Sequence, residues 1–379
     1  LRYSWGKNGN DNIGDFRYTV LTQGGNNYGF GTSNIKEWIS SKASGLANPN
    51  LKWEESEQTD LGVDFGFFNN SLTLTVDYFS KRTNGMLKDM NIPTYVGESK
   101  PVGNVGDMKN SGVEIELGYK FNISDATFGI KGNISYLKNE LVKLGNAAGF
   151  EMYDNVQNLG NVSRAEAGQP FPFFYGLKTD GIFQNQAEID AYTGANGKIQ
   201  PDARPGFVRY VDTNGDGVIN DDDRVKLGKG TPDWTFGFTF NAAWKGFDFM
   251  MFWQGTQGND IFDASRRLEL GTINLPGWIR GRWTGEGTSN RLPLFESGDV
   301  VNWQASDLYI YDGSYLRLKN IELGYTFNKK QLSFIGVSSI RVYASGNNLA
   351  TWSNIKNFDP ELGSADGYFY PQLKLWNMG

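Results

Sequence analysis

The chain has 379 residues and a formal net charge of −6, and it contains no cysteine and no histidine. Without cysteine it has no disulfide framework or thiolate metal site, and without histidine it has no Ser-His-Asp triad and no histidine-bound zinc. The acidic balance argues against nucleic acid as a partner. Any catalysis would have to depend on carboxylates, lysine, tyrosine or serine.

The composition favours strands and turns. Glycine accounts for 48 residues and aromatic side chains for 15%, while the mean hydropathy is only −0.47. Glycine is thus about twice as frequent as in an average protein. No run of about 18 apolar residues is present, so the sequence predicts no transmembrane helix. A membrane-spanning form would therefore be a β-barrel.

The first clear element is a hairpin within residues 59–79. Apolar side chains alternate with Asp and Gly over residues 61–67, which is the period of a strand with two unlike faces. Asn69 and Asn70 predict a tight turn, since Asn tolerates positive φ. The alternation then resumes over residues 72–78.

The same alternation recurs along the chain. It predicts hairpins of residues 112–121 with 128–137, 234–244 with 247–257, and 315–327 with 340–348. In the last hairpin the apolar positions change parity, which predicts a bulge near Asn320. We expect strands of about ten residues, against the usual five or six. Very short turns alternate with much longer connecting segments.

This layout is typical of an outer-membrane barrel, with short turns on one rim and long loops on the other. Aromatic residues near strand ends fit interfacial girdles; they include Tyr78, Phe79, Tyr136, Trp244 and Trp253. Carboxylates on the opposite face either line a ligand path or solvate the lumen wall; they are Asp60, Asp64, Glu114 and Glu116. A large soluble all-β protein with decorated loops is the alternative that the pattern leaves open.

Several segments together resemble the carboxy-terminal barrel portion of the SusC/RagA family of TonB-dependent outer-membrane transporters. They read, in chain order, NPNLKWEESEQTDLGVDFGFFNNSLTLTVDYFSKRTNGML, NVGDMKNSGVEIELGYKF, PFFYGLKTDGIFQNQAEIDAY, VDTNGDGVINDDDRVKLGKGTPDWTFGFTF, WKGFDFMMFWQGTQGNDIFD, SYLRLKNIELGYTF and VYASGNNLATW. The similarity runs in order from about Leu1 to Gln372.

The resemblance implies that residues 1–379 are part of an all-β, antiparallel transmembrane barrel in the outer membrane of a Gram-negative cell. The whole barrel would have about 22 strands, of which this chain would hold a little over half. The plug and the TonB-contacting segment would lie outside the chain, which reads as a fragment at both ends. The implied function is not enzymatic but import of oligosaccharides or peptides, with a SusD-like surface lipoprotein and TonB as partners.

Residues 212–223 match a calcium loop. Such a loop needs oxygen ligands at positions 1, 3, 5, 7, 9 and 12 of about twelve residues, with glycine at position 6. Asp212, Asn214, Asp216, the Val218 carbonyl, Asn220 and Asp223 occupy the ligand positions, and Gly217 occupies the bend. The flanks do not read as amphipathic helices, so we expect a structural calcium rather than a sensor. The alternative is an empty turn, since Asn and Asp also favour turns.

The membrane side of this loop depends on how the chain runs between residues 137 and 234. Counting crossings, we expect an odd number between them, which one strand at residues 172–183 does not satisfy. Either that segment does not span, or a further strand lies near residues 207–211. We favour a long surface excursion exposed to external calcium.

Aromatic side chains in and beside the long segments are candidates for cargo contacts, because their faces can stack on sugar rings or grip peptide side chains. They are Trp303, Tyr309, Tyr311, Trp352, Tyr368, Phe369 and Tyr370. The alternative is that they pack loops together or form girdles. Two other functions remain open: a secreted, calcium-stabilised glycosidase that uses paired carboxylates, and a calcium-dependent glycan-binding adhesin.

Overall fold

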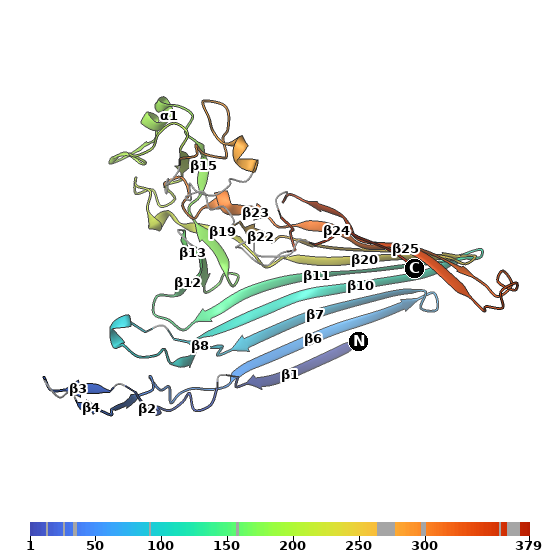
Figure 1. The fold of residues 1–379 in the computed structure, drawn as a ribbon, viewed down its shortest axis with the longest axis horizontal. Coiled ribbons are helices and arrows are strands. Elements are labelled where there is room, and N and C mark those ends of the chain that lie inside the picture. Colours follow the sequence, from blue (N-terminus) through green and yellow to red (C-terminus); the bar gives the residue numbers. More distant parts are fainter. Residues whose placement is uncertain are drawn as a thin grey trace.

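The computed structural model describes the chain except residues 13, 26, 33–35, 91, 157–158, 264–276, 297–300, 356–357 and 362–371. Its largest part is one curved sheet of ten antiparallel strands (Figure 1). In sheet order they are β1 (Arg2–Asn10), β6 (Glu54–Phe67), β7 (Leu72–Asn84), β10 (Gly106–Ile123), β11 (Ala126–Leu144), β20 (Trp234–Trp244), β21 (Phe247–Gln257), β24 (Tyr315–Phe327), β25 (Ile340–Ser353) and β26 (Leu375–Met378).

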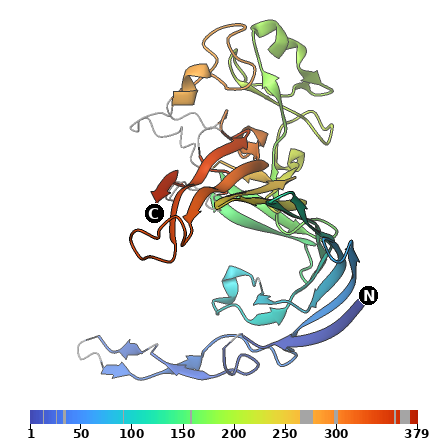
Figure 2. The same cartoon turned by 90° about the vertical axis from the view of Figure 1, so that its right-hand side faces the viewer.

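The sheet follows the order of the chain, and β1 and β26 are its two edges. Figure 2 shows the strands wrapping round in a curve, with the chain termini at opposite edges. The described sheet is therefore an open wall. It has ten strands, fewer than the little over half of a 22-stranded barrel that the resemblance implied.

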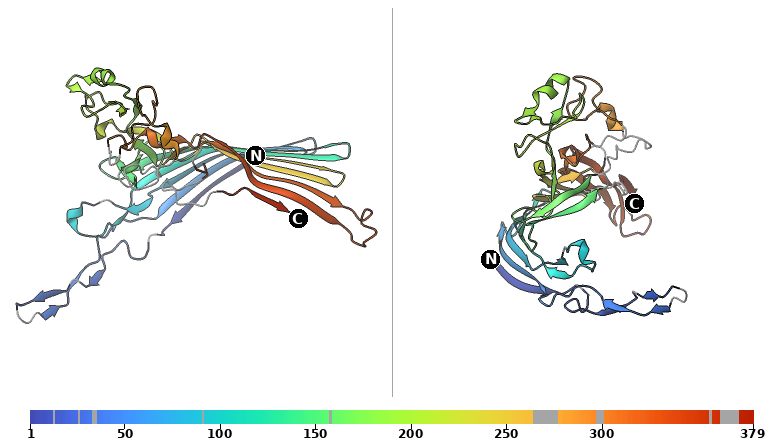
Figure 3. Two further views of the ribbon diagram at one scale, coloured as in Figure 1. Left: turned by 45° about the horizontal axis from the view of Figure 1, so that its top comes forward. Right: turned by 90° about the vertical axis from the view of Figure 1, so that its left-hand side faces the viewer.

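Short turns gather at one end of this sheet (Figure 3). They join β6 to β7, β10 to β11, and β20 to β21, and a wider turn joins β24 to β25. In the first, Phe68, Asn69 and Asn70 all have positive φ, so the predicted Asn turn is confirmed. In the third, Lys245 and Gly246 both have positive φ, as a two-residue type I′ hairpin turn requires.

All four predicted hairpins are confirmed, but several strands are longer than expected. β10 has 18 residues and β11 has 19. The extra length lies toward the loop end, where residues such as those of 106–111 carry no apolar alternation to reveal a strand. The predicted bulge is also confirmed, because the register of β24 shifts between Leu318 and Asn320 against both neighbours.

The opposite end of the sheet carries the long connecting segments, which we call excursions. The first, residues 11–53, contains β2 (Thr22–Gly24), β3 (Tyr28–Phe30), β4 (Lys36–Trp38) and β5 (Ser41–Ala43) and extends away from the sheet. The second, residues 85–105, contains β8 (Leu87–Asp89), the 3-10 helix η1 (Thr94–Val96) and β9 (Val102–Asn104). In the described part of the chain no helix has the length and apolar character to cross a membrane.

Two further excursions build a folded lobe. Residues 145–233 contain β12 (Phe150–Val156), β13 (Gly160–Glu166), β14 (Phe173–Gly176), β15 (Thr179–Ile182), α1 (Gln186–Ala191), β16 (Thr193–Gly194), β17 (Gly197–Lys198), β18 (Val208–Tyr210), η2 (Asp221–Asp223) and β19 (Val225–Lys229). Residues 258–314 contain β22 (Asp260–Phe262), η3 (Gly277–Gly281), η4 (Asp307–Tyr309) and β23 (Ile310–Asp312).

The expected odd number of crossings between residues 137 and 234 is wrong. β11 and β20 are paired neighbours in the sheet, so the chain leaves and re-enters the sheet at the same end. Residues 172–183 form the short strands β14 and β15, and the strand near residue 207 is β18, which pairs with β15. The excursion interpretation therefore agrees with the fold.

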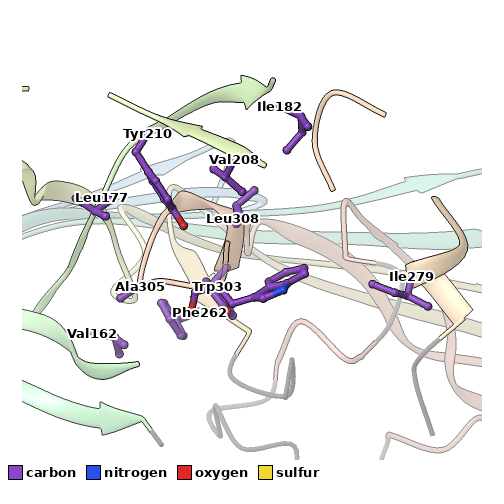
Figure 4. Packing of buried hydrophobic residues seen from close by; sticks show 11 residues of the cluster. Val162, Leu177, Ile182, Val208, Tyr210, Phe262, Ile279, Trp303, Ala305 and Leu308 are labelled. Carbon is purple, nitrogen blue, oxygen red and sulfur yellow. Dashed lines mark hydrogen bonds between the residues drawn. The ribbon is translucent and has the colours of Figure 1, made fainter. Parts of the chain in front are cut away.

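One hydrophobic core unites the two excursions of the lobe (Figure 4). The first contributes Ile182, Val208 and Tyr210, and the second contributes Trp303 and Leu308, among others. Backbone hydrogen bonds reinforce the contact: the N–H of Leu177 donates to the Ala305 carbonyl at 2.9 Å. The Thr179 hydroxyl donates to the Asp307 carboxylate at 2.6 Å. The lobe is thus one packed body held at the excursion end of the sheet.

Candidate functional site

One face of the sheet is apolar from β6 to β20. Because side chains alternate along each strand, the residues paired across the sheet share a face. One such row consists of Val63, Val76, Ile115, Ile134 and Phe236, and the next consists of Phe65, Leu74, Leu117, Gly132 and Phe238. Many of these side chains are exposed, Phe65 by 44% and Leu117 by 42%. A face of this kind needs a covering that is not water.

Aromatic rows border the apolar face at both ends. At the excursion end the rings of Tyr136 and Trp234 lie 4.8 Å apart between their centroids. At the turn end Trp244 pairs with Phe247, whose ring lies 4.6 Å from that of Tyr325. Trp234 and Trp244 are ten residue steps apart on β20, or about 33 Å along the strand. With a barrel tilt of about 40° the band is about 25 Å tall, which is the height of an outer-membrane barrel's apolar belt.

The predicted girdle residues divide between the two faces. Tyr78, Tyr136 and Trp244 lie on the apolar face. Trp244 ends β20, whereas Tyr78 and Tyr136 lie inside β7 and β11, which continue beyond the apolar rows. Trp253 lies on the apolar face beside Trp352, with 5.4 Å between ring centroids. Phe79 pairs with Asp60 and so lies on the opposite face, where its ring covers Gly112. For Phe79 the girdle prediction is wrong, because the register of β7 turns it inward.

The other face carries ion pairs and hydroxyls. The four predicted carboxylates all lie here: Asp60, Asp64, Glu114 and Glu116. Arg2 bridges Asp64 at 2.7 Å and Asp77 at 2.9 Å. A Cβ on Gly62 would lie 2.1 Å from an Asp77 carboxylate oxygen, so the glycine makes room for this pair. This polar face is suited to contact water, a polar ligand or another polar part of the protein.

A buried ion cluster joins the polar face to residues 358–361, which follow β25 in the chain. Arg317 of β24 is only 2% exposed, and its guanidinium lies 2.5 Å from Asp359 and 3.2 Å from Glu361. Lys319, the bulge residue, lies 2.6 Å from Glu361. The Arg317 Nε donates to the Thr351 hydroxyl at 2.9 Å. Because the bulge follows Arg317, Asn320 also remains on the polar face while Ile321 returns to the apolar one.

The 212–223 loop has the hydrogen bonds of a tightly bent acidic loop. Asp212 accepts from the N–H groups of Gly215 and Gly217 at 2.7 and 2.8 Å. The buried Asp223 accepts from the Thr213 and Asn220 N–H groups at 2.8 and 2.9 Å. As predicted, the loop is not flanked by two helices; the flanking elements are the strands β18 and β19.

The predicted ligand set of this loop combines three carboxylates with two amide oxygens and one carbonyl oxygen. Over the described ranges of the chain, no three acidic side chains come together in a group that could hold a metal ion. The donor chemistry nevertheless fits, because the set consists of carboxylate, amide and carbonyl oxygens. The pKa of Asp216 lies below its usual value, first because the Val218 N–H donates to it and then because of the Asn214 amide. Its carboxylate is therefore charged at neutral pH.

Comparisons with known proteins identify the family of this chain. Residues 1–349 match the family described as TonB dependent receptor-like, beta-barrel. The chain belongs to the TonB-dependent receptor family, in its SusC/RagA branch. TonB-dependent receptor P26 of Formosa agariphila is 32% identical over 367 residues, covering 95% of this chain and 36% of that protein.

Two further relatives place this TonB-dependent barrel in the same branch. TonB-dependent receptor SusC of Bacteroides thetaiotaomicron is 29% identical over 396 residues, covering 100% of this chain and 37% of that protein. The RagAB peptide importer in its open-open state superposes with a TM-score of 0.75 at 25% identity, covering 96% of this chain and 37% of that one. The barrel segment thus spans a little over a third of the length of these relatives.

The four predicted cargo residues that the structure describes do not form one exposed cluster in this TonB-dependent barrel. Trp303 and Tyr309 are 5% and 1% exposed in the lobe core, which leaves no ring face for a ligand, so their prediction is corrected to core packing. Trp352 is exposed but lies on the apolar face, opposite Leu316, where a girdle residue belongs. Tyr311 is half-buried with its ring against Phe358 and the Arg291 guanidinium. Tyr368, Phe369 and Tyr370 lie outside the described residues.

The sequence interpretation missed the ion cluster around Arg317. The sequence did contain a signal: residues 315–319 carry two basic side chains, and residues 359–361 carry two acidic side chains that could pair with them. Nothing in the spacing shows that these segments meet, since they are joined through a hairpin and an excursion.

Proposed function

We propose that the protein is an outer-membrane transporter and that residues 1–379 form part of its barrel wall. The apolar face bordered by two aromatic rows about 25 Å apart is the observation that carries the proposal. Lipid would cover this face, and the polar face would line the lumen. The short turns would lie at the periplasmic rim, and the lobe would lie outside the cell.

The cargo and partners follow from the family branch. We infer that the transporter imports oligosaccharides or peptides with a SusD-like surface lipoprotein, and that TonB supplies energy through a segment outside this chain. The similarity to the RagAB peptide importer supports import of a peptide, and the similarity to SusC supports a TonB-dependent transporter of the same branch. The polar lumen wall, with its alternating acids, bases and hydroxyls, is compatible with either hydrophilic cargo.

Calcium is the proposed structural ion of the lobe. Asp212, Asn214, Asp216, Asn220 and Asp223 would supply side-chain oxygens, and Val218 would supply its carbonyl. Bound calcium would neutralise acidic side chains that otherwise repel one another and would hold residues 212–223 in shape. The loop lies between β18 and β19, neither of which is a strand of the ten-stranded sheet. Its role is therefore stabilisation of the lobe rather than transport itself.

The proposal can be tested on the full-length protein by membrane fractionation, gel migration and uptake. We expect it in the outer-membrane fraction and expect its migration on an SDS gel to change after boiling, as a folded barrel's does. Uptake of labelled oligosaccharide or peptide should require TonB. Release of the protein without detergent, as expected for a secreted glycosidase or adhesin, would overturn the proposal.

A further inference from the structure

The lobe contains a shallow cavity, open to solvent, that neither the barrel wall nor the calcium loop explains. Its volume is about 490 Å³, within the range of about 300–1,000 Å³ of small-ligand sites. Its lining comes from both excursions of the lobe: Ile182, Gln184, Glu188 and Arg209 from the first, and Glu286, Gly287, Ser289 and Asn290 from the second.

Gln184 fastens the two sides of the cavity together. Its Nε2 donates to the Ile182 and Ser289 carbonyls at 2.9 and 3.0 Å. Its Oε1 accepts from the Gly287 N–H at 2.9 Å and from the Trp283 indole at 3.3 Å. The cavity is therefore preorganised, so a ligand would not have to order its walls.

The polar groups around the cavity are only partly used. Glu188 accepts from the Gln184 N–H through Oε2 at 2.9 Å, which leaves Oε1 for a ligand. Glu286 accepts from the Asn185 amide through Oε1 at 2.6 Å, which leaves Oε2. Asn290 accepts from the Ile182 N–H through Oδ1 at 3.1 Å, so its Nδ2 can donate. Ser289 accepts two backbone N–H groups, so its hydroxyl hydrogen can donate as well.

The charge of the cavity excludes acidic ligands. Arg209 is the one cation in the lining, and it is already paired with Asp180 at 2.9 Å. The negative charges of Glu188 and Glu286 are therefore not neutralised by Arg209, and a uronate or sulfate group would be repelled by the net negative charge of the cavity.

The mixture of donors and acceptors selects among the remaining ligands. A primary ammonium group would satisfy the two carboxylates but would face the donors of Ser289 and Asn290. A sugar hydroxyl both donates and accepts, so adjacent hydroxyls can bind carboxylates and amide donors together. We propose that this cavity binds a neutral sugar unit of a glycan cargo. This inference rests on the proposed transport function and assigns the lobe a part in capturing cargo.

The test uses the full-length transporter in detergent on an array of neutral, uronate-bearing and sulfated oligosaccharides and of short peptides with free amino termini. We expect the wild type to retain neutral oligosaccharides. The double variant Glu188→Gln/Glu286→Gln keeps the side-chain shapes and should lose retention by at least about tenfold, since hydrogen bonds to charged groups are the stronger ones. Asp202→Asn, which removes one exposed acid of the same lobe outside the cavity, should bind like the wild type.

Four results would overturn the assignment: retention of peptides alone, retention of acidic glycans alone, no retention, or equal retention of neutral glycans by the double variant. The transport proposal is judged separately by outer-membrane location and TonB-dependent uptake of any cargo. If the protein passes the transport tests but does not bind neutral oligosaccharides on the array, only the assignment of the cavity to a sugar is refuted.

Discussion

Replacing Arg317 by methionine should release residues 358–361 from the barrel wall. The side chains of Arg317 and Asp359 are 3% and 10% exposed, so the variant leaves a carboxylate in a buried site without its cation. Glu361 keeps Lys319 at 2.6 Å, so the loss falls mainly on Asp359. Removing one member of a buried pair costs about 3–5 kcal/mol, and the remaining lysine places the expected cost near the lower end, about 3 kcal/mol.

Hydrogen exchange of the full-length protein measures this effect. The Glu361 N–H donates to an Asp359 carboxylate oxygen at 3.0 Å, so its peptide reports directly on the cluster. A loss of about 3 kcal/mol in local opening free energy corresponds to roughly 100-fold faster exchange. Lys319→Met is the matched control, because Glu361 retains Arg317 and Lys319 is more exposed; it should cost less than about 1 kcal/mol.

A second variant separates the lost charge pair from lost packing. Adding Asp359→Asn to Arg317→Met should recover most of the protection, because the unpaired carboxylate is then gone. The reasoning is refuted if Arg317→Met exchanges no faster than Lys319→Met.

Three more changes test the wall and the loop. Gly112→Ala should disrupt the pairing of β10 with β11, because its Cβ would lie 1.9 Å from a backbone carbonyl oxygen. Gly132→Ala should fold normally, because its Cβ would lie 3.8 Å from the nearest backbone carbonyl oxygen. Heat-modifiable migration on an SDS gel compares the two variants. Phe238→Lys puts a charge in the middle of the apolar face and should cost about 2–4 kcal/mol in urea unfolding from lipid vesicles, while Thr239→Lys on the polar face should cost far less. Calcium chelation should speed proteolysis within residues 212–223 and leave gel migration unchanged; equal cleavage with and without calcium would contradict a bound ion.

The sheet was predictable wherever one strand face is apolar and the other is polar. β20, β21 and β24 have the predicted bounds because their apolar alternation fills most of their length. The start of β10 was missed because residues 106–111 show no such alternation. Alternation reports the difference between two environments, and beyond the apolar belt both faces are polar.

The candidate cargo residues were less predictable, because aromatic residues in long segments have several uses. Trp303 and Tyr309 pack against Val208 and Tyr210, about a hundred positions earlier in the chain. No local pattern distinguishes such a core from an exposed platform. The cavity likewise depends on Gln184 reaching Ser289, a contact that requires the folded lobe.

The shared core of the lobe also imposes an order on assembly. Its two halves are separated in the chain by the hairpin of β20 and β21, so the core can close only after both halves have been synthesised and have reached the same side. In a membrane, the two halves would have to be exported before they could meet. The lobe would then lock the four strands from β11 to β24 after insertion, and a chain stalled midway would display the unmatched apolar half of the lobe to quality-control proteases.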